Sequence, residues 1–385
     1  MLTTQRHLFS LPEGLHYLNA AYMGPLSRAT QEAGIQGILR KADPGTIVPQ
    51  DFFAGSDELR RLFARLVNAP DPSSIALVPA ASYAISLAAR GVERDVRAGQ
   101  SIVLAEAQFP SNVYPWRALA RRRGLEVRTV AAPTGPARGA AWNERLLDAI
   151  GPDTAVVALP PVHWTDGTRF DLERIGARAR EVGAALVVDG TQSVGALPFD
   201  VARVRPDALV VAGYKWLLGP YSLGCAYLGP RLAAAEPLEE TWTGRLGSED
   251  FAGLVNYRDE YQPGAVRHDV GERSNFILVP MLAAALRQIL EWDPAEIQTY
   301  CRALSAPLVE TARELGFHVE DDDARAGHLF GIRAPEGLDL DRLHARLRER
   351  HIHVSRRGSA LRISPHVYND AEDIAALARA LREAR

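Results

Sequence analysis

Two ionisable side chains of opposite charge follow two apolar segments near the middle of the chain. Asp189 comes directly after an apolar run at 186–188, and Lys215 follows a second run at 208–212. Burying an unpaired charge is costly, so charges at the ends of buried strands predict a small molecule bound between them. Pyridoxal phosphate (PLP) needs this pair, because a lysine holds it as an imine while a carboxylate keeps its ring nitrogen protonated.

Taken singly, these residues also fit ordinary structural roles. Lys215 fits a surface lysine after a strand, Asp189 fits a helix N-cap, and Gln192 fits a capping-box glutamine. In the functional interpretation, Lys215 carries the cofactor and then acts as general base, while Asp189 stabilises a carbanion at the substrate α-carbon. Gln192 is then expected to hydrogen-bond the ring hydroxyl of the cofactor. We favour this interpretation because the three residues occur together.

The cofactor phosphate needs hydrogen-bond donors, and a strand-to-helix junction at 77–82 offers them. Small residues such as Ala81 let backbone N–H groups approach an anion at a helix N-terminus, and Ser82 adds a hydroxyl. An ordinary N-cap serine is the competing explanation. The junction lacks the P-loop signature and the three glycines of a dinucleotide-binding fold, which argues against a nicotinamide-dependent dehydrogenase.

Four further residues are candidates for contacts with the cofactor or the substrate. Phe109 follows a strand and is predicted to stack on the cofactor, although such a ring is also a common core residue. Asp166 lies in the segment 163–167, which closes another strand. Arg357 and Arg362 are predicted to bind a substrate carboxylate, and the alternative is a salt-bridged arginine in an edge strand.

Short apolar strands alternate with helical segments from about residue 57 onward, which predicts an α/β protein with a large, mostly parallel sheet. Helices are expected at 111–123 and 171–182. The last two strands lie so close in the sequence that an antiparallel pair is expected there. The expected strands are 75–78, 101–105, 126–130, 155–159, 185–188, 208–211 and 225–228.

A smaller C-terminal α+β domain is expected after this sheet. A long amphipathic helix at 280–292 precedes expected strands at 314–320, 328–333 and 360–364 and helices at 340–349 and 370–382. A chain of 385 residues exceeds one ordinary core. We therefore expect three parts: an N-terminal segment, 1–50, packed near the active site; a large PLP-binding domain, 51–262; and a bridging helix with the small domain, 263–385.

The composition is that of a globular protein and gives no reason to expect a nucleic-acid or membrane partner. Hydrophobic residues make up 47% and charged residues 24%, with a net charge of −3. The N-terminus lacks the apolar core of a signal peptide, and no apolar stretch is long enough to span a bilayer. The two cysteines, Cys225 and Cys301, predict neither a disulfide framework nor a zinc site. We expect a cytoplasmic protein without a metal.

Over nearly its whole length the chain resembles the class V aminotransferase group of fold-type-I PLP enzymes. The segments that carry the resemblance are Asp-Gly-Thr-Gln at 189–192 and Ala-Gly-Tyr-Lys at 212–215. The group includes cysteine desulfurases, isopenicillin N epimerase-like proteins and kynureninase. The resemblance implies a homodimer with active sites at the interface. It also implies that the phosphate is contacted by Ser82, Tyr214 and Trp242, and that Ser274 and Asn275 extend into the partner's active site. Arg362 is then expected to bind the substrate carboxylate, and Asn19 is expected to lie near the substrate.

Departures from the group's patterns narrow the expected reaction. A desulfurase has a nucleophilic cysteine shortly before the carboxylate-binding arginine, whereas 355–359 reads Ser-Arg-Arg-Gly-Ser. Kynureninase has histidines where this chain has Gln192 and Arg245, so kynurenine is not the expected substrate. Arg245 points instead to an acidic group at the far end of the substrate.

These observations predict a PLP-dependent enzyme that acts on an α-amino acid. Transamination is the first choice, because it needs no residue beyond those named. A β-lyase or C–S lyase is the second interpretation and an epimerase the third, since all three reactions begin with the same carbanion. The alternative from another class is a binding or sensor protein that keeps the PLP fold without turnover.

Overall fold

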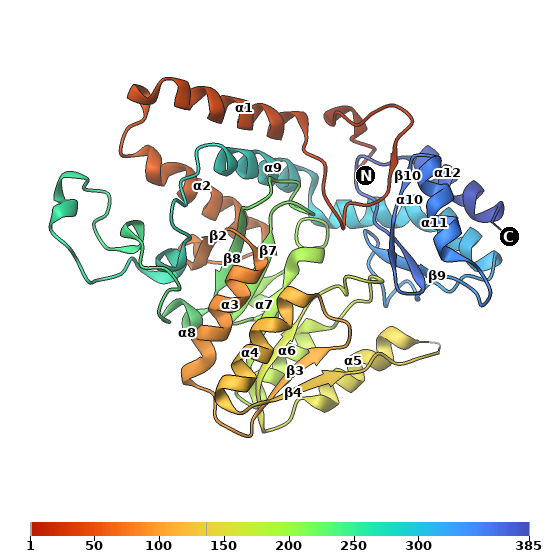
Figure 1. Ribbon diagram of the computed structural model, residues 1–385, viewed down its shortest axis with the longest axis horizontal. Helices are drawn as coiled ribbons and strands as arrows, with labels where there is room; N and C mark the ends of the chain where they lie inside the picture. Colours follow the sequence, from red (N-terminus) through yellow and green to blue (C-terminus); the bar gives the residue numbers. More distant parts are fainter. Residues whose placement is uncertain (1, 136, 385) are drawn as a thin grey trace.

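A seven-stranded sheet forms the centre of the molecule (Figure 1). The structure is a computed structural model that describes residues 2–135 and 137–384. The strand order is β2-β8-β7-β6-β5-β3-β4. Strand β8 runs antiparallel to both of its neighbours, β2 and β7, and the other neighbouring strands pair in parallel. The mostly parallel sheet and its antiparallel pair are therefore confirmed. The strands are β2 (Ile75–Val78), β3 (Ser101–Ala105), β4 (Glu126–Val130), β5 (Thr154–Leu159), β6 (Ala185–Asp189), β7 (Ala208–Ala212) and β8 (Gly224–Leu228).

Helices cover both faces of this sheet because side chains of a strand alternate between its faces. Leu186 and Val188 of β6 join the core on one face, whereas Ala185 and Val187 join the core on the other. The first face packs against α2 (Asp51–Leu66), α5 (Arg138–Ala149), α6 (Leu172–Glu181) and α9 (Leu278–Trp292). The second packs against α3 (Ala81–Gly91) and α4 (Tyr114–Arg123). Two short helices, α7 (Val201–Val204) and α8 (Pro230–Ala233), complete this part of the chain.

The C-terminal part has a hydrophobic core and a sheet of its own, at the right of Figure 1. Its three antiparallel strands lie in the order β11-β12-β9. The elements are α10 (Pro294–Glu314), β9 (Phe330–Arg333), α11 (Leu340–Glu349), β10 (Ile352–His353), β11 (Ser355–Arg357), β12 (Ala360–Ile363) and α12 (Ala371–Arg382). The α+β character expected for this region is confirmed, and its boundary at residue 263 stays a prediction.

The prediction of a strand at 314–320 is wrong. Glu314 is the last residue of α10, a helix that the sequence analysis did not predict. Gly316 adopts a left-handed backbone with φ of +77°, which ends the helical path. Extended pairing begins only at His318, which forms an isolated bridge with Arg333. Residues 314–320 are therefore a helix end and a turn.

The N-terminal segment connects the large sheet to the C-terminal part. Its strand β1 (His16–Tyr17) pairs in parallel with β10, and Leu18 N donates to His353 O at 3.0 Å. The helix α1 (Arg28–Ala42) then crosses the body beside α9, with Ser27 accepting from Thr30 N as its N-cap. Within the described residues, none of the helices is long and apolar enough to cross a membrane.

Candidate active site

A cavity of about 250 Å³ opens at one edge of the large sheet. The loops that follow β2, β3, β5, β6 and β7 line it, and so do the residues just before β8. The amino end of β8 reaches this edge because the strand is antiparallel to β7. Ligands in open α/β sheets bind outside the carboxyl ends of the parallel strands. The cavity is therefore the candidate active site.

Asp189 and Lys215 both line this cavity, as the ends of the adjacent strands β6 and β7 require. Lys215 is 6% exposed and lies in the turn directly after β7. Its Nζ lies 5.2 Å from the ring centre of Phe109 and 5.4 Å from that of Tyr214. The lysine is thus held among aromatic rings rather than in solvent.

The environment of Lys215 weakens its hold on a proton. Burial lowers the pKa of Lys215 to about 8, and the positive charges of Arg362 and Arg357 act in the same direction against the opposing charge of Asp189. A neutral amine is the nucleophilic and basic form of lysine. The site therefore favours the form of Lys215 that can attack an aldehyde or accept a proton.

Asp189 is held in place by the loop that follows it. Its Oδ1 accepts from Thr191 N at 3.1 Å, and Thr191 Oγ1 in turn accepts from Ala212 N at 3.3 Å. Burial raises the pKa of Asp189, while the hydrogen bonds from Thr191 and the charge of Lys215 lower it. Thr191 is a positioning residue that sequence reasoning missed, because its partner is 21 residues away in the sequence.

The N-terminus of α3 reaches the same cavity through Ala81 and Ser82. The first N–H groups of a helix have no intrahelical partners, and the N-cap residue Ala80 supplies no side-chain cap. These groups and the Ser82 hydroxyl are available to a bound anion. The competing explanation, Ser82 as an N-cap, is wrong because it is the second residue of the helix.

Aromatic side chains form part of the cavity wall. Phe109 and Trp164 pack edge to face, with ring centres 5.4 Å apart, and Tyr214 and Tyr221 lie 4.6 Å apart. All four line the cavity. Trp164 and Tyr221 were not predicted, although Trp164 lies in the segment 163–167 that the sequence analysis placed at a strand end. Flat, apolar walls of this kind suit a planar ligand.

Gln192 lines the cavity, but its side chain is largely engaged elsewhere. Its Nε2 donates to Ala21 O at 3.1 Å, and its Oε1 accepts from Trp216 Nε1 at 2.9 Å. One amide hydrogen is left for a ligand, so the predicted contact with a ring hydroxyl stays a prediction. Through Ala21, Gln192 also connects the N-terminal segment to the site. A second connection is the hydrogen bond from Gly24 N to Tyr214 O, at 2.9 Å.

Asn19, Ser355 and Arg362 form a chain of polar contacts beside the cavity. Ser355 Oγ donates to Asn19 Oδ1 at 2.8 Å and accepts from Arg362 Nη2 at 3.4 Å. Arg362 Nη1 donates to Trp164 O at 2.9 Å. Burial lowers the pKa of Arg362 to about 9, and the nearby charge of Arg357 acts in the same direction. The structure thus brings Asn19 and Arg362 together next to a wall residue of the cavity.

Arg357 contacts the same wall residue, Trp164, at its ring rather than at its backbone. Its guanidinium lies over the ring of Trp164, 5.2 Å from the centroid, and its Nη1 donates to Arg356 O at 2.7 Å. Arg356 itself pairs with Asp341 on α11. Of the two adjacent arginines, Arg357 therefore lies against a residue that lines the cavity, although it is not itself a lining residue.

Asp166 is not brought to the cavity, which corrects the sequence-based expectation. It is buried between Arg138, with Nη1 at 3.0 Å, and Arg333, with Nη2 at 2.7 Å. Burial raises the pKa of Asp166, but the interaction with nearby His163 and the two arginine charges outweigh burial and hold that pKa well below its usual range. Gly331 packs against it without a side chain. Asp166 joins the large sheet to the C-terminal part.

Trp242, Ser274 and Arg245 lie away from the cavity within one chain. Trp242 packs edge to face against Phe53, with ring centres 6.0 Å apart, and Ser274 is a half-buried residue of the turn at 271–274, before α9. Arg245 Nη2 pairs with Glu240 Oε2 at 2.5 Å. This ion pair neutralises Arg245. The acidic substrate group that the sequence analysis expected opposite Arg245 therefore has no free guanidinium to bind at that position. The contacts of Trp242 and Ser274 with a phosphate or a partner subunit stay predictions.

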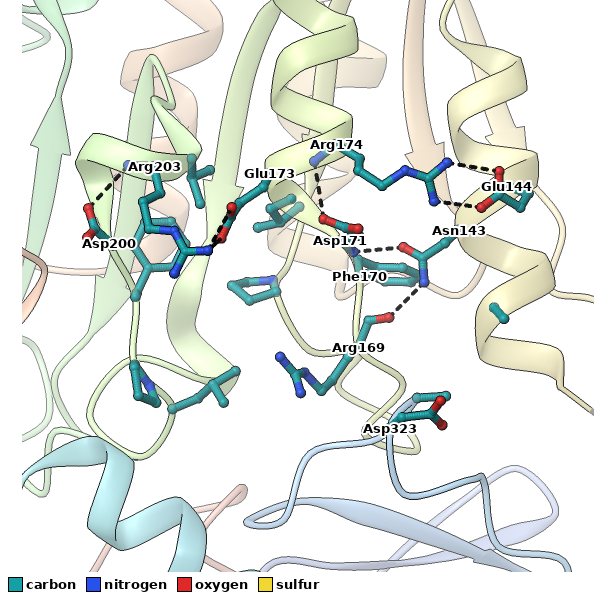
Figure 2. Close-up of a pocket in the computed structure, with 18 residues that line it drawn as sticks. Asn143, Glu144, Arg169, Phe170, Asp171, Glu173, Arg174, Asp200, Arg203 and Asp323 are labelled. Atoms are coloured by element: carbon teal, nitrogen blue, oxygen red, sulfur yellow. Dashed lines mark hydrogen bonds and ion pairs between the residues drawn. The ribbon is translucent and has the colours of Figure 1, made fainter.

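A second, more open groove of about 600 Å³ lies between α5, α6 and the segment before β9 (Figure 2). Two of its arginines pair with acids: Arg174 with Glu144 at 2.7 Å and Arg203 with Glu173 at 2.9 Å. Its lining contains neither a lysine nor a cysteine. The groove is larger than the cavity at the strand ends, but its side chains offer no amine that could hold the cofactor of the chemistry predicted above.

The chemistry of the cavity fits PLP. Its buried amine, with a lowered pKa, matches the cofactor aldehyde, and its buried carboxylate matches the ring nitrogen. The aromatic walls match the face of the ring, and the free helix N–H groups match the phosphate. Lys215, Asp189, Phe109 and Ser82 are the residues that would hold these groups. Each of them lines the one cavity.

Comparisons with known proteins agree with this fit. The sequence model of the family Aminotransferase class-V matches residues 48–377. Isopenicillin N epimerase from Streptomyces clavuligerus is 29% identical over 384 residues, which covers 94% of this chain and 93% of the epimerase.

Solved structures share the fold. Cysteine desulfurase CsdA from Escherichia coli has a TM-score of 0.82 and 22% identity, covering 98% of this chain and 97% of CsdA. A variant of C-DES with glycine covalently linked to its PLP cofactor has a TM-score of 0.85 and 22% identity, covering 98% of this chain and 99% of C-DES. C-DES is a cystine C–S lyase. At this identity the likeness shows the fold alone, which is that of fold-type-I PLP enzymes.

Proposed function

Because the chain belongs to the class V aminotransferase family, whose cofactor is PLP, we propose that it acts on an α-amino acid and transfers its amino group to an α-keto acid. The observation that supports this proposal most directly is the pair Asp189 and Lys215 in one cavity, with the pKa of Lys215 lowered to about 8 by burial. A lysine in this state can serve first as the cofactor's attachment point and then as a base.

The residues of the site have distinct roles in the proposed reaction. When bound, PLP supplies an aldehyde and a ring that withdraws electrons from the substrate α-carbon. Asp189 would pair with the protonated ring nitrogen, and Arg362 would bind the α-carboxylate. Lys215 Nζ would remove the α-proton and hold it for return. Phe109 and Trp164 would exclude water from the reacting atoms.

Transamination is the preferred reaction because one base is enough for it. The titratable residues that line the cavity are Asp189, Tyr214, Lys215 and Tyr221. Burial raises the pKa of Tyr214, which leaves Lys215 as the lining group suited to accept a proton near neutral pH. Epimerisation, the activity in the name of the bacterial relative, also needs a proton donor on the opposite side of the α-carbon.

A β-lyase or C–S lyase reaction is the alternative, because it starts with the same proton removal by Lys215. Desulfurase chemistry is a poorer fit, since it needs a reactive cysteine. Both Cys225 and Cys301 are fully buried, and burial raises the pKa of each thiol. The segment 355–359, where a desulfurase would have its reactive cysteine, contains no cysteine.

Borohydride reduction of the holoenzyme followed by peptide mapping tests the attachment point. We expect the label on Lys215, and the other lysine of the chain, Lys41, is the matched internal control because it is exposed on α1. Lys215→Ala should abolish both the cofactor absorption band and turnover, whereas Lys41→Ala should change neither. A label on Lys41, or none, contradicts the proposal.

Product analysis then tests the reaction. Incubation with amino acids and α-keto acids should give exchange of the amino group between the two. Release of pyruvate and ammonia without exchange would favour the lyase, and inversion of the substrate α-carbon without either would favour the epimerase.

A further inference from the structure

We propose that Arg357 binds a second anionic group of the substrate, so that the site takes α-amino acids with an acidic side chain. This inference rests on the proposed function and names its substrate class. Arg362 takes the α-carboxylate in that function. Arg357 is a separate guanidinium at the same wall residue, Trp164.

The β11–β12 hairpin directs both guanidiniums to one face. Side chains two residues apart share a face of a strand, so Ser355 and Arg357 lie together and Arg356 lies opposite. Ser355 pairs across the hairpin with Arg362, which puts Arg362 on the face of Ser355 and Arg357. The turn is short, with Gly358 at φ of +54°, and it holds this register. Arg356, on the other face, pairs with Asp341.

Neither Arg357 nor Arg362 has a carboxylate partner within residues 2–135 and 137–384. Arg362 donates only to Trp164 O and Ser355 Oγ, and Arg357 only to Arg356 O. The Nε atoms of both are buried and without a hydrogen-bond partner. A buried donor left unpaired costs free energy, and two like charges on one hairpin face repel each other. A bound anion at each guanidinium removes both costs.

The charge balance of the site leaves room for two anionic groups. The charges of Arg357 and Arg362 both act on Lys215, and Asp189 is the one carboxylate among the residues that line the cavity. The phosphate has its own donors at the N-terminus of α3. A monocarboxylic amino acid would neutralise Arg362 and leave Arg357 uncompensated.

The two guanidiniums lie at different depths, which suits two groups on one molecule. Arg362 is 1% exposed and contacts the backbone of Trp164, whereas Arg357 is half-buried and lies over its ring. An α-carboxylate bound at the inner arginine leaves the side chain of the substrate to extend toward the outer one. The planar fork of arginine suits a carboxylate at that end.

Paired substrates that differ only in charge test this inference. The holoenzyme is titrated with aspartate against asparagine and with glutamate against glutamine, and dissociation constants are read from the cofactor absorbance and from tryptophan fluorescence. We expect the wild type to prefer the acid of one pair by about 10- to 100-fold, the value of one charge-assisted contact. Arg357→Gln should remove this preference, and Arg357→Lys should keep part of it.

Arg356→Gln is the matched control, because it removes the same charge one residue away on the opposite face. It should keep the wild-type preference, and thermal melts should show that each variant is folded. Equal affinity for acid and amide in the wild type, or a preference that survives Arg357→Gln, overturns the inference but leaves the proposed function intact. A protein with no cofactor band, or one that responds to no amino acid, overturns both.

Discussion

At the scale of single residues, one amine is surrounded by competing influences on its charge. Burial and two arginines favour the neutral form of Lys215, and Asp189 favours the charged form. Neutral lysine attacks an aldehyde, while ammonium does not. The balance among these groups therefore controls how readily the protein takes up its cofactor.

The rate of cofactor capture should follow this balance. Deprotonation of Lys215 creates the nucleophile, so capture of PLP by the cofactor-free protein should rise with pH and level off above a midpoint near 8. Arg362→Gln removes a positive charge and should move the midpoint up, whereas Asp189→Asn removes a negative charge and should move it down. Stopped-flow absorbance between about pH 6 and about pH 11 measures the midpoint, and the reference value is the unperturbed lysine pKa of about 10.4. A wild-type midpoint above 10 would contradict this assignment.

At the scale of elements, the N-terminal segment holds the site together from both sides. Ala20 N donates to Ser364 O at 3.1 Å, next to the hairpin, and Gly24 N donates to Tyr214 O at 2.9 Å, next to Lys215. Gly24 lies so close to the Lys215 backbone that an added Cβ would collide with Lys215 O. The absence of a side chain at 24 is thus a condition for the position of Lys215.

Gly24→Ala should displace the turn that carries Lys215. We expect a loss of about 1–3 kcal/mol of stability, typical of overpacking, together with weaker cofactor binding. Thermal melts and a PLP titration measure the two effects. Gly45→Ala is the control, because a Cβ there meets only Asp43 Oδ1 at an ordinary 3.7 Å. Equal cofactor affinity in the two variants would show that the contact at residue 24 does not position Lys215.

At the scale of the whole molecule, one surface stands out by its apolar side chains. Three side chains share a face of α1 at helical spacing and are each between 50% and 58% exposed: Ile35, Ile38 and Leu39. The segment between α8 and α9 projects from the body (Figure 1) and exposes Tyr257. Large exposed apolar patches mark interaction surfaces. The homodimer expected from the family resemblance, proposed here to use α1, gives these side chains a partner.

A charge on this face should separate the subunits. Ile38 is 58% exposed, so Ile38→Asp should leave the fold of one chain intact while placing two charges in a symmetric interface. Sedimentation velocity should give a dimer for the wild type and a monomer for the variant. Ala177→Asp, on the exposed face of α6, adds the same charge away from α1 and should stay dimeric. A monomeric wild type would rule out the dimer.

The sequence by itself determined the sheet and its central chemical pair. Continuous apolar runs make buried parallel strands, and such strands end at a common edge, so Asp189 and Lys215 could be predicted to lie together. The helix N-terminus at Ala81 and Ser82 was predictable for the same reason. These conclusions need only local patterns and the geometry of parallel strands.

Only the tertiary structure decided which polar residues join that pair. Asp166 follows a strand as Asp189 does, yet it pairs with Arg333, 167 residues away, because the C-terminal part packs against its loop. Asn19 meets Ser355 across 336 residues, and the face of the hairpin decides between Arg356 and Arg357. Contacts between segments so far apart leave no local pattern, because they depend on how segments distant in the sequence pack against one another.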